Sequence, residues 1–501
     1  MRFSTDDGVI GEVSSLCPQC GVAVPADVFV RDGRVYQQQR CPCHKSSENL
    51  IFSDTDLYRR LDSWNDLVFS ASASDTDPDS LPSPTLAVID TTNRCNFKCP
   101  VCFAESNGHG SRYFLELNLV RGMLQALIAR PIPCRHVQLS GGEPTLHPEF
   151  QAILRIARDL GFTHIQVATN GSRMVDAGYV RRCEDSGLHT IYLQFDGVDD
   201  NVYLKLRGQR LLGSKIRAVE NVAKTNMRLV LVPTVASSIN VDQIGPIFRF
   251  ALQYSKHVTG ISIQPAANVG RVDVDSEQSE PFNLATMAKE FSAQTGLTRF
   301  PDDWFPLNAV SLIGRAVSIL RRDRSFGAAC DAHCSLGTYF YINDNNEPTC
   351  INRFLDLEGF FKGLSKVASA ADYSKLGRRI SQLQEIARLS QCFSRQQAPK
   401  GLTFKRLLLG LDGWEDKSCG RSPGWFHRGF NGMFVAGMHF MDARSYNLRR
   451  LGRCIIQYVT TSGELIPFCS YNAGARLRDV EESARIDQAR LAQTAIPDSA
   501  P

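Results

Sequence analysis

The chain has 501 residues, of which 43% are hydrophobic and 22% charged, and its formal net charge is +4. This size predicts about two to four domains, and so small a charge gives no reason to expect a nucleic-acid partner. No apolar run of about 18 residues predicts a membrane-spanning helix, and the polar N-terminus does not resemble a signal peptide. We therefore expect a cytoplasmic protein whose 16 cysteines are suited to metal binding rather than disulfides.

Residues 1–69 are predicted to form a small metal module. Cys17-Pro-Gln-Cys20 is followed by an Asp-Gly hairpin signal and then by Cys41-Pro-Cys43-His44. Two such knuckles joined by a hairpin are typical of zinc ribbons and rubredoxin-like iron sites. We expect one iron or zinc ion on Cys17, Cys20 and Cys41. The fourth ligand is His44 or Cys43, and His44 is favoured because a ligand two residues from Cys41 would strain the loop.

Residues 70–84 have the composition of a linker, and alternating strand and helix patterns follow over residues 85–270. The expected strands are Leu86–Asp90, His136–Ser140, His164–Thr169, Thr190–Phe195, Arg228–Val235 and Gly260–Gln264, and the expected helices span about 113–130, 148–160, 176–187, 214–225 and 240–256. Such units predict a parallel α/β sheet or barrel, with the chemistry at the carboxyl ends of its strands.

Two motifs follow the first two of these strands. Cys95, Cys99 and Cys102 form a CxxxCxxC triplet. Three thiolates at this spacing can hold three irons of a [4Fe–4S] cluster and leave the fourth iron open for a small chelating ligand, whereas a zinc site would more often have a fourth Cys or His nearby. The second motif, which contains Gly141-Gly142-Glu143, is a glycine turn whose bare backbone could approach a ligand's amino group.

Together these motifs resemble the radical S-adenosylmethionine (SAM) enzymes, which implies a partial (β/α)6 barrel. The resemblance implies that Cys95, Cys99 and Cys102 are the catalytic cluster ligands, with SAM chelated by the open iron. Gly141, Gly142 and Glu143 would then meet the SAM amino group. The strand-end residues that are candidates to contact the ribose and adenine, or else to cap loops, are Asn170, Asp196 and Gln264.

The remaining cysteines concentrate in an α+β region, residues 271–475. Cys334–Cys350 and Cys454–Cys469 each read as a hairpin with two thiols at its open end, and Cys330 adds a fifth thiol. These hairpins resemble the auxiliary-cluster (SPASM or twitch) domains of some radical SAM enzymes, which implies at least one further [4Fe–4S] cluster. Which four cysteines share a cluster stays open. Residues 476–501 are expected to be a polar tail.

Four further cysteines are expected to be free thiols. Cys134 and Cys183, outside any ligand pattern, are expected to be buried small apolar side chains. Cys392 and Cys419 are spare cluster candidates that are more simply interpreted as free thiols.

Several longer runs resemble the archaeal tetraether lipid synthases and their bacterial relatives: Thr190–Val198, Leu229–Val235, Ile261–Pro265, Met438–Arg444 and Pro467–Asn472. That family joins the terminal methyl carbons of two lipid alkyl chains and carries a SAM cluster, auxiliary clusters and a rubredoxin-like metal. One departure is that residues 45–94 contain no cysteine, where the family has a further cysteine cluster.

The resemblance therefore predicts hydrogen abstraction from an unactivated carbon of a lipid-like substrate, followed by C–C bond formation. It implies an electron donor of flavodoxin or ferredoxin type. A radical SAM maturase of a peptide, a radical SAM methylase and a redox scaffold are the alternatives. The basic-apolar run Lys405–Leu411 could give peripheral membrane contact. Apolar side chains that could line a lipid channel, or be ordinary core, are Trp304, Phe305, Leu312, Ile313, Ile319, Trp425, Phe426, Phe430, Met433, Phe434 and Met438.

Overall fold

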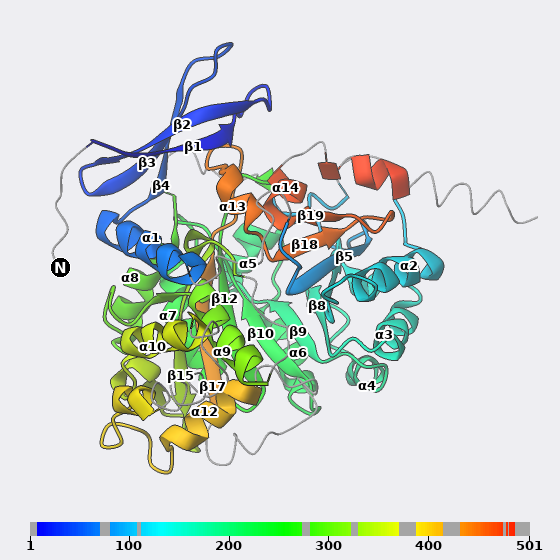
Figure 1. The fold of residues 1–501 in the computed structure, drawn as a ribbon. Helices are drawn as coiled ribbons and strands as arrows, with labels where there is room; N and C mark the ends of the chain where they lie inside the picture. Colours follow the sequence, from blue (N-terminus) through cyan, green and yellow to red (C-terminus); the bar gives the residue numbers. More distant parts are fainter. Residues whose placement is uncertain are drawn as a thin grey trace, which may run out of the picture.

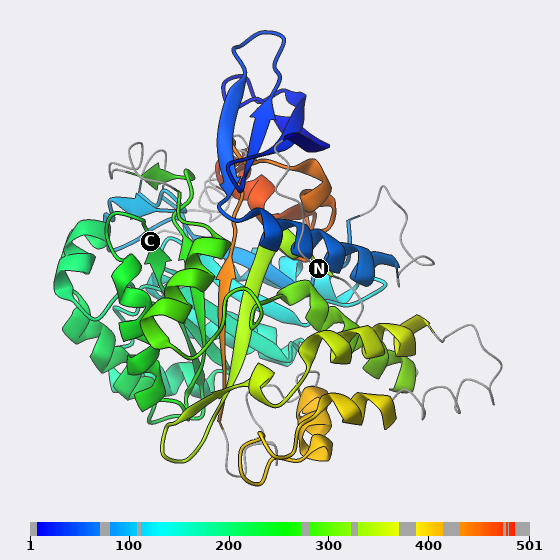
Figure 2. The ribbon, with the colours of Figure 1, turned by 90° about the vertical axis from the view of Figure 1, so that its left-hand side faces the viewer.

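The computed structural model describes residues 8–70, 81–107, 112–272, 281–321, 329–369, 387–413, 431–473, 477–478 and 480–485. A small antiparallel sheet at the N-terminus projects from a large α/β body, as Figures 1 and 2 show. Most of the expected linker, most of the expected tail, Cys419 and three of the candidate channel residues (Trp425, Phe426 and Phe430) lie outside the described residues.

Six parallel strands in chain order form the centre of the large sheet (Figure 1). They are β5 (Leu86–Thr92), β7 (His136–Gly141), β8 (His164–Thr169), β9 (Thr190–Gln194), β10 (Arg228–Val232) and β12 (Val258–Pro265). Their apolar residues are buried on both faces, which is typical of a parallel sheet between two layers. The predicted α/β fold with parallel strands is therefore confirmed.

Helices pack against the outer face of these strands and follow the predicted strand–helix alternation. They are α2 (Leu117–Ile128), α3 (Phe150–Asp159), α4 (Ala177–Asp185), α5 (Asp200–Arg207), α6 (Leu212–Val222) and α7 (Ile244–Gln253). Helix α5 is not among the predicted helices. It begins at the Asp199 cap, whose carboxylate accepts from the Asn201 N–H, and it ends at Gly208 with φ 75°.

The C-terminal region adds strands to both edges of this same sheet. Beside β12, β17 (Asn431–Met438) runs parallel and β15 (Ser335–Ile342) antiparallel. Beside β5, β18 (Ile456–Val459) runs parallel and pairs in turn with β19 (Leu465–Pro467). Among the described residues the sheet reaches 13 strands, so the strands that follow residue 271 extend the barrel sheet instead of forming a separate one.

The N-terminal module is a four-stranded antiparallel sheet. Its strands are β1 (Gly8–Leu16), β2 (Ala23–Arg31), β3 (Arg34–Gln39) and β4 (Ser47–Phe52). The turn between β2 and β3 has φ of 51° at Asp32 and 70° at Gly33, which confirms the predicted Asp-Gly hairpin. Two buried glutamines fix the module to the C-terminal region, since Gln37 donates to the Tyr446 carbonyl (3.1 Å) and Gln39 to the Ala443 carbonyl (2.9 Å).

Shorter elements complete the body. They are α1 (Thr55–Ser70), β6 (Val101–Cys102), β11 (Thr234–Val235), β13 (Arg271–Val272), α8 (Leu284–Thr295), β14 (Phe305–Pro306), α9 (Ser311–Arg321), β16 (Pro348–Cys350), α10 (Leu357–Ser369), α12 (Phe404–Gly413), α13 (Leu448–Gly452) and α14 (Phe468–Ala473). The 3-10 turns are η1 (Pro144–Leu146), η2 (Val241–Gln243), η3 (Leu307–Val310), η4 (Ala332–Cys334), η5 (Ile351–Arg353) and η7 (Ser390–Cys392).

Several apolar side chains considered for a lipid channel belong to the main core instead. Trp304, Leu312 and Met433 are fully buried there, and Trp304 packs against Phe291. Cys134 and Cys183 lie in the same core, as expected for small apolar side chains. Within the described part of the chain, no helix is long and apolar enough to cross a membrane.

Candidate active site and metal centres

The N-terminal module gathers four metal-binding side chains. The ligand atoms of Cys17, Cys20, Cys41 and His44 all lie within 4.8 Å of one another. His44 Nδ1 is 3.5 Å from the Cys41 sulfur, whereas Cys43 is exposed. Hydrogen bonds from the Cys20 and Gln19 backbone, the first being the stronger, lower the pKa of Cys17 to about 6. This donor set and spacing fit one tetrahedral iron or zinc ion.

The triplet Cys95, Cys99 and Cys102 lies in the loop that follows β5. All three side chains are partly buried. Burial is the main cause that raises the pKa of Cys95 to about 12, and Glu143 and the nearby Cys99 and Cys102 thiols contribute to the same rise. The three sulfurs therefore face a common space, but among the described residues only the N-terminal set is close enough for a single ion. Such wider spacing fits a four-iron cluster, because each thiolate then binds a different iron.

Hydrogen bonds from distant elements fix the backbone of this loop. Arg271 Nε donates to the Cys99 carbonyl at 2.8 Å, and β13 pairs with β6 so that Arg271 lies opposite Cys102. Asn107 donates to the Cys95 carbonyl at 2.8 Å and accepts from the Cys95 N–H at 3.2 Å. These bonds hold the backbone of the loop in place.

The two glycines of the second motif are required by the protein backbone itself. Gly141 has φ 120°, and a Cβ there would lie 2.1 Å from the Thr92 carbonyl oxygen. A Cβ on Gly142 would lie 2.2 Å from the Arg94 carbonyl oxygen. The bare backbone thus lies directly against the chain that leads into the cysteine loop, and the contact of these glycines with the SAM amino group stays a prediction.

Glu143 is fully buried, and its carboxylate is already bonded within the protein. It accepts from Thr169 Oγ1 (2.7 Å), from the Asn170 N–H (2.7 Å) and from both the N–H and the hydroxyl of Thr145. Burial raises the pKa of Glu143. The carboxylate thus joins the ends of β7 and β8, and the contact of Glu143 with the SAM amino group stays a prediction.

Asp196 is also buried, and its carboxylate already accepts hydrogen bonds from within the protein. Its two oxygens accept from Arg207 Nε and Nη2, each at 2.8 Å, and one also accepts from the Thr234 N–H at 3.0 Å. Arg207 also donates to the Val101 carbonyl inside the cysteine loop at 2.8 Å. The carboxylate thus supports the loop through Arg207, and the contact of Asp196 with the ribose or adenine stays a prediction.

Asn170 and Gln264 remain at strand ends as expected. Asn170 Nδ2 lies 3.9 Å from the Cys95 sulfur and donates to Asn96 Oδ1 at 2.9 Å. Gln264 is half-buried at the end of β12 and pairs with Thr234 of β11. Both positions border the cysteine loop or its neighbouring strand ends.

Lys215 is a site residue that the sequence did not reveal. Its amine, on α6, donates to the Asn170 carbonyl (2.6 Å) and to Gln194 Oε1 (3.1 Å), and the side chain is 1% exposed. Burial lowers the pKa of Lys215 to about 8. A lysine in a helical run normally indicates a solvated face, so only the tertiary structure identifies this cation beside the strand ends.

Four of the five C-terminal thiols come together. The thiols of Cys330 and Cys454 lie close enough to Cys334 to interact electrostatically with it, and Cys469 interacts with Cys454 and Cys334. Arg450 donates to the Cys334 sulfur (3.6 Å), and its Nε has no partner among the described residues. We call Cys330, Cys334, Cys454 and Cys469 the C-terminal quartet; four thiols beside a buried cation fit an anionic [4Fe–4S] cluster.

Cys350 does not join the quartet. It lies opposite Phe340 in the β15–β16 pair, about six residues, or roughly 20 Å at strand rise, from Cys334. Its sulfur is 3.5 Å from the Thr338 hydroxyl instead. The expectation that this hairpin closes two thiols at one end is therefore wrong, whereas Cys454 and Cys469 do lie at the open end of β18–β19.

Three phenylalanines connect the two cysteine groups. Phe103, next to Cys102, lies with its ring centroid 5.2 Å from Phe440 and 5.6 Å from Phe468, and Phe468 precedes Cys469. The Met441 N–H contacts the Cys469 sulfur at 3.4 Å. The cysteine loop and the quartet are thus separated by one aromatic layer.

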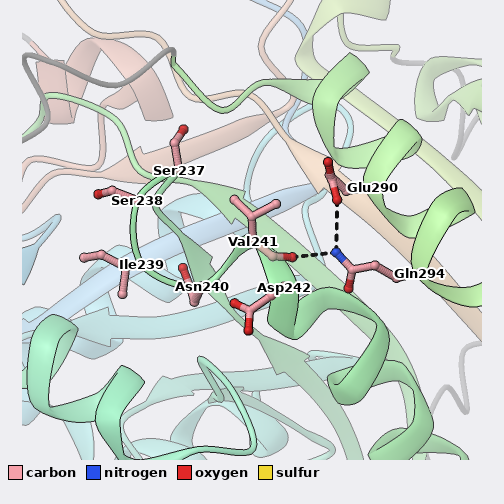
Figure 3. A pocket seen from close by; sticks show the side chains of 8 residues that line it. All are labelled: Ser237, Ser238, Ile239, Asn240, Val241, Asp242, Glu290 and Gln294. Carbon is pink, nitrogen blue, oxygen red and sulfur yellow. Dashed lines mark hydrogen bonds between the residues drawn. The ribbon is translucent and has the colours of Figure 1, made fainter.

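A surface pocket of about 540 Å³ lies elsewhere, between the segment after β11 and helix α8 (Figure 3). Gln294 closes one wall by donating to the Val241 carbonyl at 2.8 Å and to Glu290 at 3.1 Å. Asn240 reaches inward to the Asp196 carbonyl at 2.9 Å. None of the cluster cysteines lines this pocket, so we do not assign the chemistry to it.

Two family models match the chain. Residues 89–251 match the Radical SAM superfamily, and residues 9–53 match the HMPTM N-terminal zinc ribbon domain. The central sheet therefore has the radical SAM fold, preceded by a zinc ribbon.

Among curated proteins, the 7,8-dihydro-6-hydroxymethylpterin dimethyltransferase of Methanocaldococcus jannaschii is 32% identical over 486 residues, covering 94% of this chain and 95% of that protein. The GTP 3′,8-cyclase of Rhodopseudomonas palustris is 24% identical and covers 43% of this chain and 61% of its own length. Among solved structures, Streptococcus suis SuiB bound to S-adenosylmethionine has a TM-score of 0.37 at 18% identity and covers 49% of this chain and 53% of its own.

The four converging ligands of the N-terminal module predict that substitutions at the adjacent residues His44 and Cys43 affect the metal content differently. We expect His44→Ala to lose the module's metal ion, because one of the four converging ligand atoms is removed, and Cys43→Ser to retain it. Plasma mass spectrometry of the full-length protein measures the content, and the element that is lost identifies iron or zinc. Metal loss only in the Cys43→Ser variant would contradict the assignment.

The C-terminal quartet predicts a second contrast. Cys454→Ser should lower the iron content of the reconstituted protein by about four irons per chain, the content of one cluster. Cys350→Ser serves as the matched control and should leave it unchanged, because its thiol lies apart. Equal iron in the Cys454→Ser variant and wild type would remove the quartet as a cluster site.

The buried Asp196–Arg207 ion pair predicts how the free energy of unfolding changes when one or both partners are replaced. Asp196→Asn should lower the free energy of unfolding by about 3–5 kcal/mol, because it leaves a buried guanidinium uncompensated. The double variant Asp196→Leu/Arg207→Met should lower the free energy of unfolding by less than the single substitution does, because no unpaired charge is left buried. If Asp196→Asn instead weakens SAM binding at unchanged stability, as measured by calorimetry and chemical unfolding, then Asp196 contacts the cofactor.

Proposed function

This chain belongs to the radical SAM family that contains the 7,8-dihydro-6-hydroxymethylpterin dimethyltransferase, and we propose that it is a radical SAM methyltransferase acting on a reduced pterin. One observation carries the proposal: the similarity to that relative extends through the zinc ribbon, the barrel and the C-terminal strands, over 94% of this chain. A shared barrel alone would leave the substrate open. The methylase alternative therefore fits better than lipid coupling.

The tetraether lipid hypothesis lacks a corresponding observation. Five of the residues that would line a lipid channel are core side chains, whereas Phe434 and Met438 are only partly buried. The five are Trp304, Phe305, Leu312, Ile313 and Met433. The short run from Lys405 lies in α12, and Leu407 on that helix is fully buried in the core. The relative that covers 94% of this chain is named for a pterin substrate, and we do not propose a lipid substrate.

The chain's own residues suit the proposed reaction. Cys95, Cys99 and Cys102 would hold the cluster, and the Asn170 side chain offers a polar group beside it for SAM. When bound, cluster and SAM supply a 5′-deoxyadenosyl radical, which removes hydrogen from a substrate C–H bond. The methyl group would come from a second SAM, which leaves as S-adenosylhomocysteine. A flavodoxin or ferredoxin type donor would supply two electrons, one that cleaves the first SAM and one that completes the new C–C bond.

The quartet and the module would add two metal groups to this arrangement. The quartet would hold an auxiliary [4Fe–4S] cluster across the Phe103 layer from the reacting groups, with Arg450 offsetting its charge. The zinc ribbon contacts the 441–446 segment beside Cys469, so its ion would stabilise the quartet's surroundings rather than react.

The proposal is tested with purified, reconstituted protein, SAM, dithionite and 6-hydroxymethyl-7,8-dihydropterin. We expect a pterin product heavier by one methylene for each methyl transferred, together with 5′-deoxyadenosine, both measured by liquid chromatography and mass spectrometry. Cys99→Ala is the matched control and should yield neither, because the cluster loses one of three thiolates.

Other products would overturn the proposal. Formation of 5′-deoxyadenosine without any pterin of increased mass excludes pterin methylation. A product equal to two lipid chains less two hydrogens restores the lipid hypothesis, and deuterium transfer to 5′-deoxyadenosine from a labelled peptide supports the maturase.

A further inference from the structure

A group of buried polar side chains lies beside the cysteine loop and has no role in holding the metals. It consists of Asp90 on β5, Tyr471 on α14, and Arg478 and Arg485 from the C-terminal segment, and we call it the Asp90 group. Asp90 is 2% exposed, Tyr471 is fully buried and Arg485 is 1% exposed. Asp90 occupies the inner face of β5, two residues after Val88, which packs against Tyr471.

Hydrogen bonds within the protein satisfy only some of the polar atoms of the Asp90 group. Arg485 donates to the Asp90 carbonyl and to the Tyr113 hydroxyl, each at 3.0 Å. Arg478 donates to the Ala104 carbonyl at 3.0 Å, directly after the cysteine loop, and to Asn472. The Asp90 carboxylate reaches Arg478 only at 3.9 Å. These contacts tie the C-terminal segment to the loop.

Four atoms of the Asp90 group have no hydrogen-bond partner among the described residues. They are Asp90 Oδ1, Tyr471 Oη, Arg478 Nε and Arg485 Nη2. Buried polar atoms without partners are rare in folded proteins and each costs free energy. Here one acceptor, two guanidinium donors and one hydroxyl are left over in a single group, which is the set that a bound polar molecule would use.

The unpaired atoms are suited to a ligand that presents an N–H group beside a carbonyl. A carboxylate oxygen accepts from an N–H, and guanidinium nitrogens donate to a carbonyl. An amide edge in a ring presents this N–H beside this C=O. Aromatic rings line the same region, because Tyr471 stacks on Tyr458 at 4.0 Å and Tyr458 on Phe468 at 5.3 Å.

We infer that Asp90, Tyr471 and Arg478 bind the amide edge of the substrate's pyrimidinone ring, with Asp90 accepting the ring N–H and Arg478 donating to the ring carbonyl. This inference rests on the proposed function for the identity of the ring as a pterin. It assigns the recognition of the substrate to the inner face of β5 and the C-terminal segment, next to the cysteine loop that Arg478 contacts.

Binding of 6-hydroxymethyl-7,8-dihydropterin to the reconstituted full-length protein tests the inference by anaerobic titration calorimetry. We expect Asp90→Asn to raise the pterin Kd about tenfold or more, the usual scale for a hydrogen bond to a charged group, and Tyr471→Phe to raise it about threefold. The Kd for SAM should not change in either variant. Asp303→Asn removes another buried, arginine-paired carboxylate and should leave the pterin Kd unchanged.

Each alternative outcome is decisive. If wild type binds the pterin and both variants bind it equally well, the Asp90 group is a water-filled structural network and the inference fails while the proposed function stands. If wild type binds no pterin, both fail. Should Asp90→Asn not fold, Tyr471→Phe decides, because it retains the ring packing and removes only the hydroxyl.

Discussion

The bidentate ion pair between Asp196 and Arg207 is the interaction on which the geometry of the candidate active site depends. It joins the end of β9, the start of β11 at Thr234 and the cysteine loop at Val101 through bonds of 2.8–3.0 Å. Such a buried pair is costly to desolvate, and removing one partner leaves an uncompensated charge. The cysteine loop therefore keeps its position only while both partners are present.

A second set of bonds completes the support of this loop from the opposite side. Glu143 joins β7 to β8, and the absence of side chains at Gly141 and Gly142 lets the Thr92–Arg94 backbone lie directly against them. The motif residues with the strongest sequence signal thus act on the protein's own backbone. They position the site, and Asn170 offers a polar side chain beside the cysteine loop.

The C-terminal region extends both edges of the barrel sheet and assembles the C-terminal quartet beside it. Its strands pair with β5 at one edge and β12 at the other, and so bring cysteines that lie more than a hundred residues apart into one quartet. The Phe103, Phe440 and Phe468 rings fill the space between this quartet and the cysteine loop. Because the zinc ribbon contacts the same segment through Gln37 and Gln39, all of the cysteine groups share one connected framework.

The sequence alone determined the six parallel strands, the Asp-Gly hairpin and the cysteine knuckles, because these signals are local: apolar periodicity, turn chemistry and short ligand spacings act within a few residues. It also indicated His44 over Cys43 from loop strain. Only the tertiary structure decided which thiols form the quartet, that Glu143 and Asp196 are internally bonded, and that Lys215 and the Asp90 group lie beside the loop. Those facts depend on pairing across the sheet and on burial, which bring together residues whose separation in the chain carries no signal.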